Sequence, residues 1–394
     1  MFRRQTQTSD RNRSGTIVVL AAIGIVTAIG FCAFVVDIGM LTVTKAQMQS
    51  AADSAAHAAA MEIARAFGPG AELSSEMAEV VARDRAVEMV SLFRTGDVVS
   101  TVADPSRDVR LGRRTWDESA GGWVDEWGVT PYNMVEVTVY RTKAETTGLP
   151  ATFARIFSHE SFDLKAVSVA ALHPGAGFYL PPDSDETTIN ILPIALDLGS
   201  WNALLAQHYD DVDGGYGDNY AWTQQTGVYS HGDGIPEINI YPDLNSDKAP
   251  GNRGTVDLGS ANNSTNDLKR QIVYGLNSSD LSFFPNNRIE FNSSGALYLN
   301  GDTGISAGIE NSLESIIGQV RAIPIFIEVT GQGNNAVYSI VQFVGVRILD
   351  VRLSGGPSRR HLTVQPAVYS SEYVIRDSID INVDSILSQP VIIR

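Results

Sequence analysis

The chain has 394 residues, of which 43% are hydrophobic and 19% are charged. That length and composition exclude a largely disordered chain and predict two or three packed domains of roughly 100–200 residues each. The 45 Asp+Glu outnumber the 29 Lys+Arg and give a net charge of −16, which argues against a nucleic-acid partner, because phosphate binding needs a concentrated basic face. The single cysteine, Cys32, excludes an internal disulfide framework and a cysteine-cluster zinc site.

A membrane-spanning helix is predicted close to the N-terminus. Residues 16–36 form a run of 21 residues without a charge, and 12 of them are Ile, Val, Leu or Phe. As a helix this run is about 32 Å long, which matches the hydrocarbon core of a bilayer, and its insertion is favourable by about 5 kcal/mol. We therefore assign residues 15–36 as a transmembrane helix. The alternative is a signal peptide cleaved after Ala28-Ile29-Gly30.

The charges on either side of this run predict its orientation. Four arginines and one aspartate precede it, and Lys/Arg-rich flanks stay in the cytoplasm. Residues 1–14 are therefore expected to be a basic cytoplasmic segment, and the long acidic remainder is expected outside the cytoplasm.

The helix is expected to continue to Phe67, where Gly68-Pro69-Gly70 ends it. Small and apolar residues recur at steps of three and four along this part and form one helical face: Met48, Ala52, Ala55, Ala59, Ile63 and Ala66. A stripe of small side chains lets another helix approach closely, so we predict a contact surface for partner helices. The alternative is a stalk without a partner role.

The N-terminal region resembles that of TadG-like proteins, which belong to the tight-adherence (Tad) Flp-pilus assembly systems of bacteria. The likeness rests on Val36-Asp37-Ile38-Gly39 and on the alanine-rich segment from Gln47 to Ala60. A weaker likeness covers residues 135–139 and the segment Thr152-Phe153-Ala154-Arg155-Ile156-Phe157. The resemblance implies an inner-membrane protein whose bulk lies in the periplasm and which takes part in pilus assembly or anchoring.

Two features depart from related patterns. The Gly and Glu that a prepilin peptidase reads in pilins stand five residues apart, but Gly15 is followed at that distance by Leu20, which argues against processing as a pilin subunit. Many TadG-like proteins carry a von Willebrand A domain with an Asp-x-Ser-x-Ser metal site. Here Asp197 is followed by Gly199 and Trp201 where the serines are needed, so we do not expect that domain.

The predicted fold class is a membrane-anchored α+β protein: a long N-terminal helix, a small helix-plus-sheet unit and a larger β-rich domain. Residues 37–172 form the pilin-like unit, with a second helix at 71–94 and strands near 134–140 and 165–172. The expected apolar side of that helix consists of Leu73, Met77, Val80, Val81, Val87 and Val90. A Pro/Gly-rich linker is expected at 173–186. Residues 187–394 alternate short strands with long polar turns, and one helix is expected at 309–319.

A serine nucleophile is one candidate for catalysis. Gly304-Ile305-Ser306-Ala307-Gly308 matches G-x-S-x-G, and Asp350 and His361 follow in the order that serine hydrolases use. The alternative is the glycine-rich start of a helix, where Asp302, Thr303 or Ser306 accepts amide hydrogen bonds.

A calcium loop is the other candidate. Carboxylates and glycines gather at 210–219, and the oxygen ligands would come from Asp210, Asp211, Asp213 and Asp218. The spacing is not that of an EF-hand, and a solvated acidic turn is the alternative. The six histidines lack the H-x-x-x-H and H-E-x-x-H spacings of zinc hydrolases.

The sequence thus favours a non-enzymatic, single-pass protein of the bacterial inner membrane without a cofactor. Its partners would be membrane lipid and other pilus-assembly or envelope proteins, bound through the N-terminal helix. Its role would be that of a structural, anchoring or adhesive component of a Tad-type pilus system. The alternatives are a calcium-dependent surface adhesin, with Ca²⁺ as its ligand, and a serine-type envelope hydrolase.

Overall fold

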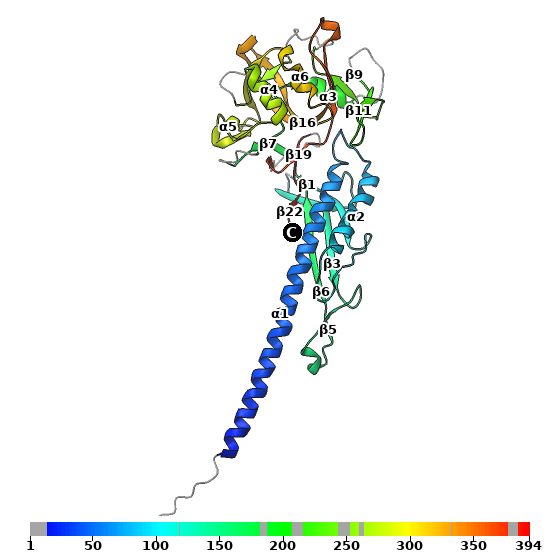
Figure 1. Ribbon diagram of the computed structural model, residues 1–394, viewed down its shortest axis with the longest axis vertical. Coiled ribbons are helices and arrows are strands. Elements are labelled where there is room, and N and C mark those ends of the chain that lie inside the picture. Colours follow the sequence, from blue (N-terminus) through cyan, green and yellow to red (C-terminus); the bar gives the residue numbers. More distant parts are fainter. Residues whose placement is uncertain are drawn as a thin grey trace, which may run out of the picture.

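A computed structural model describes residues 14–117, 119–181, 187–206, 216–242, 253–259, 264–331, 333–376 and 385–394. A long N-terminal helix runs out of a small helix-and-sheet unit, the stalk, and a β-rich head lies beyond the stalk at the other end (Figure 1). The expected long helix followed by a larger β-rich region is confirmed, and the main sheet of that region combines antiparallel and parallel pairs.

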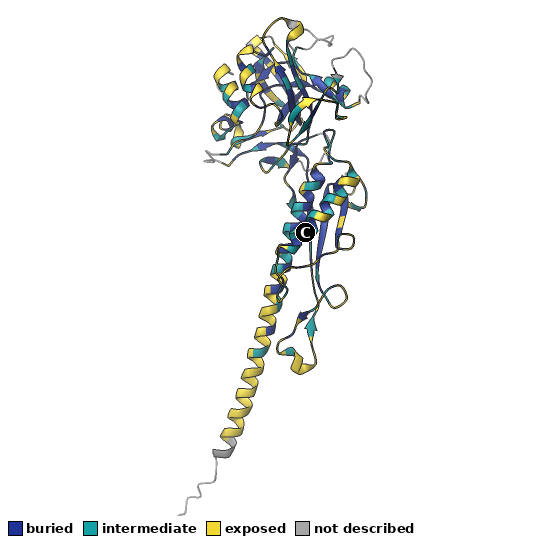
Figure 2. Ribbon diagram, turned by 45° about the vertical axis from the view of Figure 1, so that its right-hand side comes forward, coloured by how far each residue is buried: buried dark blue, intermediate teal, exposed yellow. Residues whose placement is uncertain are grey.

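Helix α1 (Ser14–Ala64) has 51 residues and is about 77 Å long. It contains no proline and its second half is rich in alanine, the strongest helix former. A glycine in the left-handed region, Gly68 with φ 84°, stands just beyond its end. The first half is exposed, whereas the second half buries one side, mainly from Met48 onward (Figure 2).

Helix α2 (Ser75–Ser91) packs against the buried half of α1. Ser74 caps it by accepting a hydrogen bond from the amide of Met77 at 3.2 Å. Its buried side chains are three alanines and a valine, at 78, 82, 86 and 90. Of the side expected to be apolar, Val90 is buried and Val87 packs against the same core, whereas Met77 and Val80 are exposed.

The alanine stripe of α1 is therefore covered by the chain itself. Five of its six residues are fully buried in one core shared with α2 and the stalk sheet: Met48, Ala52, Ala55, Ala59 and Ile63, while Ala66 is half-buried. This corrects the prediction of a surface for a separate partner helix. The close approach that small side chains permit is used here for α2.

The stalk sheet is antiparallel, with the order β2-β1-β3-β6-β22. Its strands are β1 (Val109–Asp117), β2 (Gly122–Trp127), β3 (Met134–Arg141), β6 (Leu164–Ala171) and β22 (Val391–Ile392). Alternate residues of β3, Val135, Val137 and Val139, join the core under α1 and α2. β22 comes from the C-terminal end of the chain, so part of the region expected in the β-rich domain belongs to the stalk.

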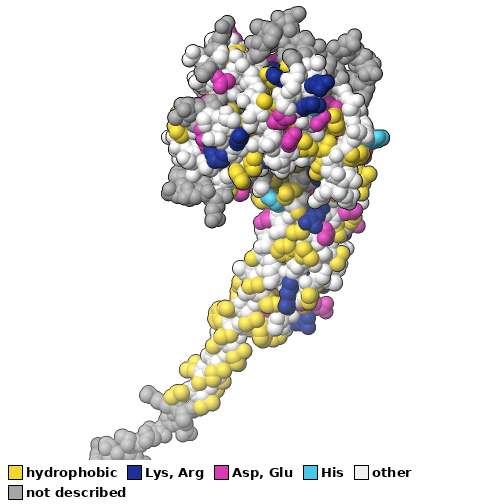
Figure 3. All heavy atoms as spheres, turned by 45° about the horizontal axis from the view of Figure 1, so that its top comes forward, with side chains coloured by type: hydrophobic (Ala, Val, Ile, Leu, Met, Phe, Trp, Pro, Cys, Tyr) yellow, Lys and Arg dark blue, Asp and Glu magenta, His cyan; other side chains and the backbone are white. Residues whose placement is uncertain are grey.

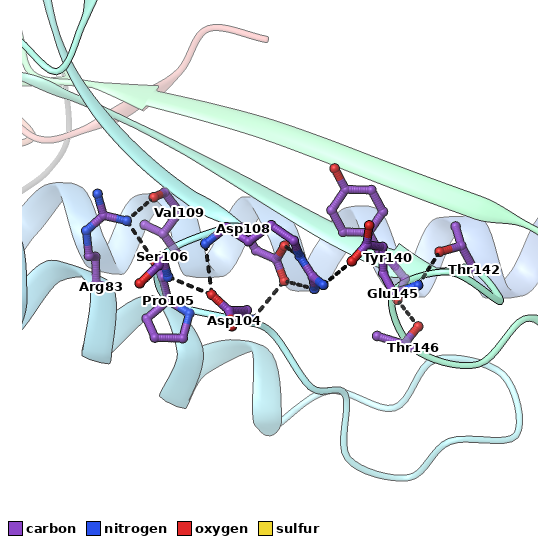
Figure 4. A network of polar contacts seen from close by, with 11 residues as sticks. Arg83, Asp104, Pro105, Ser106, Asp108, Val109, Tyr140, Thr142, Glu145 and Thr146 are labelled. Atoms are coloured by element: carbon purple, nitrogen blue, oxygen red, sulfur yellow. Dashed lines mark hydrogen bonds and ion pairs between the residues drawn. The ribbon is translucent and has the colours of Figure 1, made fainter.

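A polar network fixes the loops of the stalk (Figure 4). Arg83 of α2 donates to the carbonyls of Pro105, at 2.6 Å, and Val109. Arg107 forms ion pairs with Asp108 and Glu145. These contacts hold α2, the start of β1 and the turn after β3 together.

The head is built on a sheet with the path β13-β15-β17-β18-β12-β9, and β16 pairs with β17 while β8 pairs with β16. Its strands are β8 (Leu196–Asp197), β9 (Tyr216–Gly217), β12 (Glu237–Asn239), β13 (Thr255–Val256), β15 (Leu297–Asp302), β16 (Val320–Thr330), β17 (Ala336–Arg352) and β18 (His361–Pro366). Side chains of β16 alternate between two cores, with Ile323 and Ile325 in one and Ala322 and Phe326 in the other.

Helices cover one face of this sheet. These helices are α3 (Leu198–Ala206), α4 (Thr265–Tyr274) and α6 (Glu310–Glu314), which contribute to the first core. The short helix α5 (Ser278–Leu281) instead contributes Leu281 to the second core. The other face packs on a small sheet of β7 (Gly175–Tyr179), β14 (Arg288–Glu290) and β20 (Val374–Arg376). Three further pairs are short: β10 (Tyr220–Thr223) with β11 (Gly227–Ser230), β19 (Ser370–Ser371) with β21 (Leu387–Ser388), and β4 (Leu149–Pro150) with β5 (Ser161–Phe162).

Two sequence expectations differ from the head as it is built. Residues 175–179, expected within a linker, form β7 and pair with two other strands. The helix expected at 309–319 is shorter, because a 3₁₀ turn at Ala307–Ile309 precedes α6, which ends at Glu314. The rest of the expected linker, residues 182–186, and the basic segment 1–13 lie outside the described residues.

Candidate membrane-anchoring site

The first half of α1 is apolar on every side and has no protein cover. We call residues 17–36 the apolar segment. Its large side chains are exposed around the whole helix, for example Ile17 at 65%, Phe31 at 69% and Val35 at 66%, and yellow side chains gather along the same stretch in Figure 3. A helix that is apolar all round is stable only in an apolar environment.

By length and composition, the part of α1 from Ile17 to Ala64 qualifies as a candidate membrane span, and its most apolar window has no buried residue. A signal sequence near the N-terminus satisfies the same criterion. The described part of the chain contains one such helix.

Asp37 ends the apolar segment and binds a distant turn. This residue is buried although its neighbours Val36 and Ile38 are exposed. Its carboxylate accepts hydrogen bonds from the amides of Thr152 at 2.9 Å, Phe153 at 3.1 Å and Ala154 at 2.7 Å. These amides open the 3₁₀ turn η1 (Ala154–Phe157), whose own N-cap residue makes no side-chain cap, so Asp37 supplies the missing cap from α1.

Polar side chains of α1 then bind the edge of β6. Gln49 donates to the carbonyl of Val167 at 3.1 Å, and the ammonium of Lys45 donates to the carbonyl of Lys165. β22 pairs with β6 at Ala170 and Ala171, and the two residues after β22 continue the hydrogen bonds to Val169. Among the described residues, no strand pairs with this edge of β6 at Lys165 and Val167. Lys45 and Gln49 therefore satisfy carbonyls that would otherwise stay open to water or to another chain.

The stalk joins the head through Arg347 of β17. Its guanidinium forms an ion pair with Glu72 at 3.0 Å, donates to the carbonyl of Gly318 at 2.8 Å and lies 3.6 Å from the ring centre of Trp222. Burial lowers the pKa of Arg347, and Glu72 opposes that shift. A cavity of about 550 Å³ opens beside these residues, between the turn after α1 and the head.

His173 lies at a second point of this junction, just after β6. It is buried, and its ring stacks edge-on against Trp123 at 5.2 Å between centres. Burial, with the positive charges of Arg376 and Arg114, lowers the pKa of His173 from 6.5 to about 4. The imidazole is therefore neutral at pH 7.

The three residues of the predicted serine triad do not come together. Asp350 and His361 do pair, with 2.9 Å between the carboxylate and Nε2, but the third partner is the hydroxyl of Tyr220, which donates to Asp350 at 2.8 Å. Ser306 caps the turn at 307–309 and accepts from the amide of Gly308 at 3.2 Å, as the alternative interpretation expects. Among the described residues, Ser306 is not in the lining of the cavity that holds the pair.

That cavity has a volume of about 370 Å³ and contains a buried acid, Glu237. Burial raises the pKa of Glu237, although its carboxylate accepts from the amides of Tyr220 at 2.6 Å and Asn219 at 3.0 Å. Burial and Asp350 raise the pKa of Tyr220 to about 12. These groups bind one another, which is sufficient to explain their positions.

Three of the four proposed calcium ligands, Asp210, Asp211 and Asp213, lie outside the described residues. The fourth, Asp218, accepts hydrogen bonds from the amides of Asp233 at 2.8 Å and Gly234 at 3.1 Å. In the described ranges no three His, Cys, Asp or Glu side chains stand close enough to hold a metal ion. Asp197, the aspartate of the incomplete Asp-x-Ser-x-Ser pattern, forms an ion pair with Arg253 at 3.0 Å.

Residues 15–62 match a family model described as putative Flp pilus-assembly TadE/G-like. The resemblance of the N-terminal region to TadG-like proteins is thereby confirmed. The match covers most of α1 and ends before α2. No curated protein and no solved structure matches the chain.

The sequence did not predict the contact between Asp37 and residues 152–154, although both segments carry parts of the family likeness. Val36-Asp37-Ile38-Gly39 and Thr152-Phe153-Ala154 carry separate parts of the family likeness, and the structure brings them into hydrogen-bonding contact. The available signal was Asp37 itself, a charged residue directly after an apolar run. A carboxylate that is buried at such a position needs hydrogen-bond donors from elsewhere in the chain.

Proposed function

We propose that this protein is an anchoring or scaffold component of a Tad-type pilus assembly system, held in the bacterial inner membrane by the apolar segment of α1. The observation that carries the proposal is the apolar helix without protein cover, within a segment that matches the pilus-assembly family. A role in pilus assembly is supported by that match. The anchoring role, the single-pass topology and the absence of catalysis are parts of the proposal.

The proposed orientation places the N-terminus in the cytoplasm and the stalk and head in the periplasm. Arg3, Arg4, Arg11 and Arg13 precede the apolar segment, and such a bias retains the preceding end inside. The contacts of α1 with β6 begin at Lys45, only nine residues after Val36, so the stalk would stand directly on the membrane surface. Its partners would then be other envelope proteins that reach the stalk or head.

The test is the fate of the full-length chain in a bacterial host. We expect it to stay in the membrane fraction after alkaline washing, with a C-terminal alkaline phosphatase fusion active and a C-terminal green fluorescent protein fusion dark. Ile25→Arg together with Val26→Arg should abolish insertion, because two central arginines cost about 5–7 kcal/mol against the roughly 5 kcal/mol that favours it.

Val99→Arg is the matched control, since Val99 is an exposed apolar residue of the stalk and its substitution should leave insertion unchanged. Recovery of the wild-type chain in the soluble fraction, or an N-terminus that begins after Gly30 in the mature protein, would refute the anchor. The second outcome would show that the apolar segment is a cleaved signal peptide.

A further inference from the structure

A second apolar surface lies beside the apolar segment. The turn between β4 and β5, residues 151–160, is named here the tip. It exposes Phe153, Ile156 and Phe157, and the last two are 78% and 77% exposed. β4 and β5 have two residues each, so the tip has no sheet of its own on which these side chains could pack.

The position of the tip follows from Asp37. That residue directly follows Val36, the last residue of the apolar segment, and it holds the amides of Thr152 and Ala154. The start of η1 is thereby fixed at the level where the apolar segment ends. From there the tip extends along the exposed half of α1, toward the N-terminal end of the helix (Figures 1 and 2).

The composition of the tip suits the boundary between lipid and water. Two aromatic rings and an isoleucine supply apolar area, and exposed Arg155 lies between them in the sequence. Arginine binds phosphate through two parallel hydrogen bonds, and large apolar side chains anchor peripheral segments at the level of the headgroups. Glu160 and His159 stand at the far end of the turn, after Ser158.

We propose that the tip inserts Phe153, Ile156 and Phe157 into the same leaflet from which α1 emerges, with Arg155 at the lipid phosphates. This inference rests on the proposed function, because it needs α1 to span the bilayer. Lipid is the occupant that the geometry supports, since the tip is fixed beside a helix segment that lipid itself would surround. The protein would thus contact the membrane at two points, the span and the tip, and this would fix the tilt of the stalk.

The test uses the full-length protein in vesicles of phosphatidylethanolamine and phosphatidylglycerol that contain a lipid with a nitroxide near the top of its acyl chain. An environment-sensitive fluorophore is attached to one cysteine at a time. Native Cys32, exposed within the apolar segment, reports on the span. Phe157→Cys and, separately, Ile156→Cys, each combined with Cys32→Ser, report on the tip.

Tyr298→Cys with Cys32→Ser is the matched control, because Tyr298 is an exposed aromatic residue of the head. We expect the probes at 156 and 157 to lose most of their fluorescence to the nitroxide, as the probe at Cys32 does, and the probe at 298 to lose none. Exposed positions are chosen so that the labels do not disturb the core.

The outcomes separate the two proposals. Quenching at Cys32 without quenching at 156 and 157 overturns the tip proposal while the span stands, and the tip is then a surface for another protein. Absence of quenching at Cys32 refutes the span, and the tip proposal falls with it. Equal quenching at 157 and 298 would show non-specific adsorption of the chain and would also overturn the tip proposal.

Discussion

Substitution of Asp37 tests the link between α1 and η1 most directly. Asp37→Ala removes the acceptor for three backbone amides at residues 152–154. A hydrogen bond to a charged group is worth about 1.5–3 kcal/mol when both partners are buried, but water can reach the freed amides of this exposed turn. We therefore expect each carboxylate oxygen to contribute about as much as one helix cap. Asp37→Ala should then reduce the free energy that stabilises the turn at residues 152–154 by about 2–3 kcal/mol in total.

The loss should be local, because the strands β4 and β5 that carry the tip have two residues each and the tip points away from the head (Figure 1). Amide hydrogen exchange of the full-length protein in lipid nanodiscs measures it. Exchange at 152–154 should accelerate about 30- to 150-fold in Asp37→Ala. Asp37→Asn keeps one acceptor oxygen without the charge and should fall between the variant and the wild type.

Asp117→Ala is the control for Asp37→Ala. The carboxylate of Asp117 also accepts two backbone amides, from Ser119 at 2.8 Å and Ala120 at 3.1 Å, but in its own turn. It should leave exchange at 152–154 unchanged. Unaltered exchange at 152–154 in Asp37→Ala would show that the carboxylate does not hold η1, and the positional argument for the tip would lose its basis.

Three further predictions concern the core and the junction. The pKa of His173 is about 4 in the folded chain against 6.5 in the unfolded chain, so the unfolded state binds more protons between pH 4 and pH 6.5. The contribution of His173 to the free energy of unfolding should therefore be fully present above pH 6.5. It should fall by about 3 kcal/mol as the pH drops to 4. Urea unfolding midpoints of the full-length protein in detergent, taken at several pH values, measure this loss. In His173→Gln the midpoint should depend less on pH. An equal pH dependence in the variant and the wild type would assign the effect to other groups. Ala55→Leu together with Ala59→Leu should lower the free energy of unfolding by about 2–6 kcal/mol in the same assay, because there is no space for the added volume between α1 and α2. If the double variant is fully stable and only its binding to partner proteins is lost, the partner-surface hypothesis would be restored. Arg347→Met should speed limited proteolysis at the turn after α1 about tenfold, because the guanidinium that binds Glu72 of the stalk is lost. Glu72→Gln should have a smaller effect, because the amide oxygen can still accept a hydrogen bond from the guanidinium and the ion pair is partly exposed. Equal proteolysis of wild type and Arg347→Met would show that this contact does not hold the junction.

The sequence predicted the extent of α1 well and the buried side of α2 only in part. An uninterrupted run without proline and with a charge-free first half fixes a long helix, and the expected end at Phe67 lies three residues beyond the observed Ala64. The expected apolar side of α2 was chosen by large side chains, but Met77 and Val80 are exposed. Where two helices cross closely, small residues occupy the contact because they let the backbones approach. The size of apolar side chains is then a poor guide to which side of the helix is buried.

Long-range pairing accounts for most of what the sequence did not reveal. β22 joins the stalk sheet through β6, more than 200 residues earlier in the chain, and no local pattern encodes such a partner. Sequence distance also separates the members of the pattern Ser306, Asp350, His361. The acid and the imidazole are close in the sequence and meet on the neighbouring strands β17 and β18. The serine lies on a different element and caps its own turn.

The continuity of α1 determines what the proposed anchor can do mechanically. Between Val36 and the first contact with β6 at Lys45 there are eight residues, all helical, and Asp37 already ties this stretch to the turn before η1. A flexible linker would let the head move freely relative to the bilayer. Here the proposed span and the part of α1 that packs in the stalk core belong to one continuous helix. Arg347 and Glu72 extend the connection from the turn after α1 into the central strand of the head. A force applied to the head would therefore reach the membrane through packed alanines and hydrogen-bonded strand edges rather than through loose chain, which is the property that an anchoring component of a surface fibre requires.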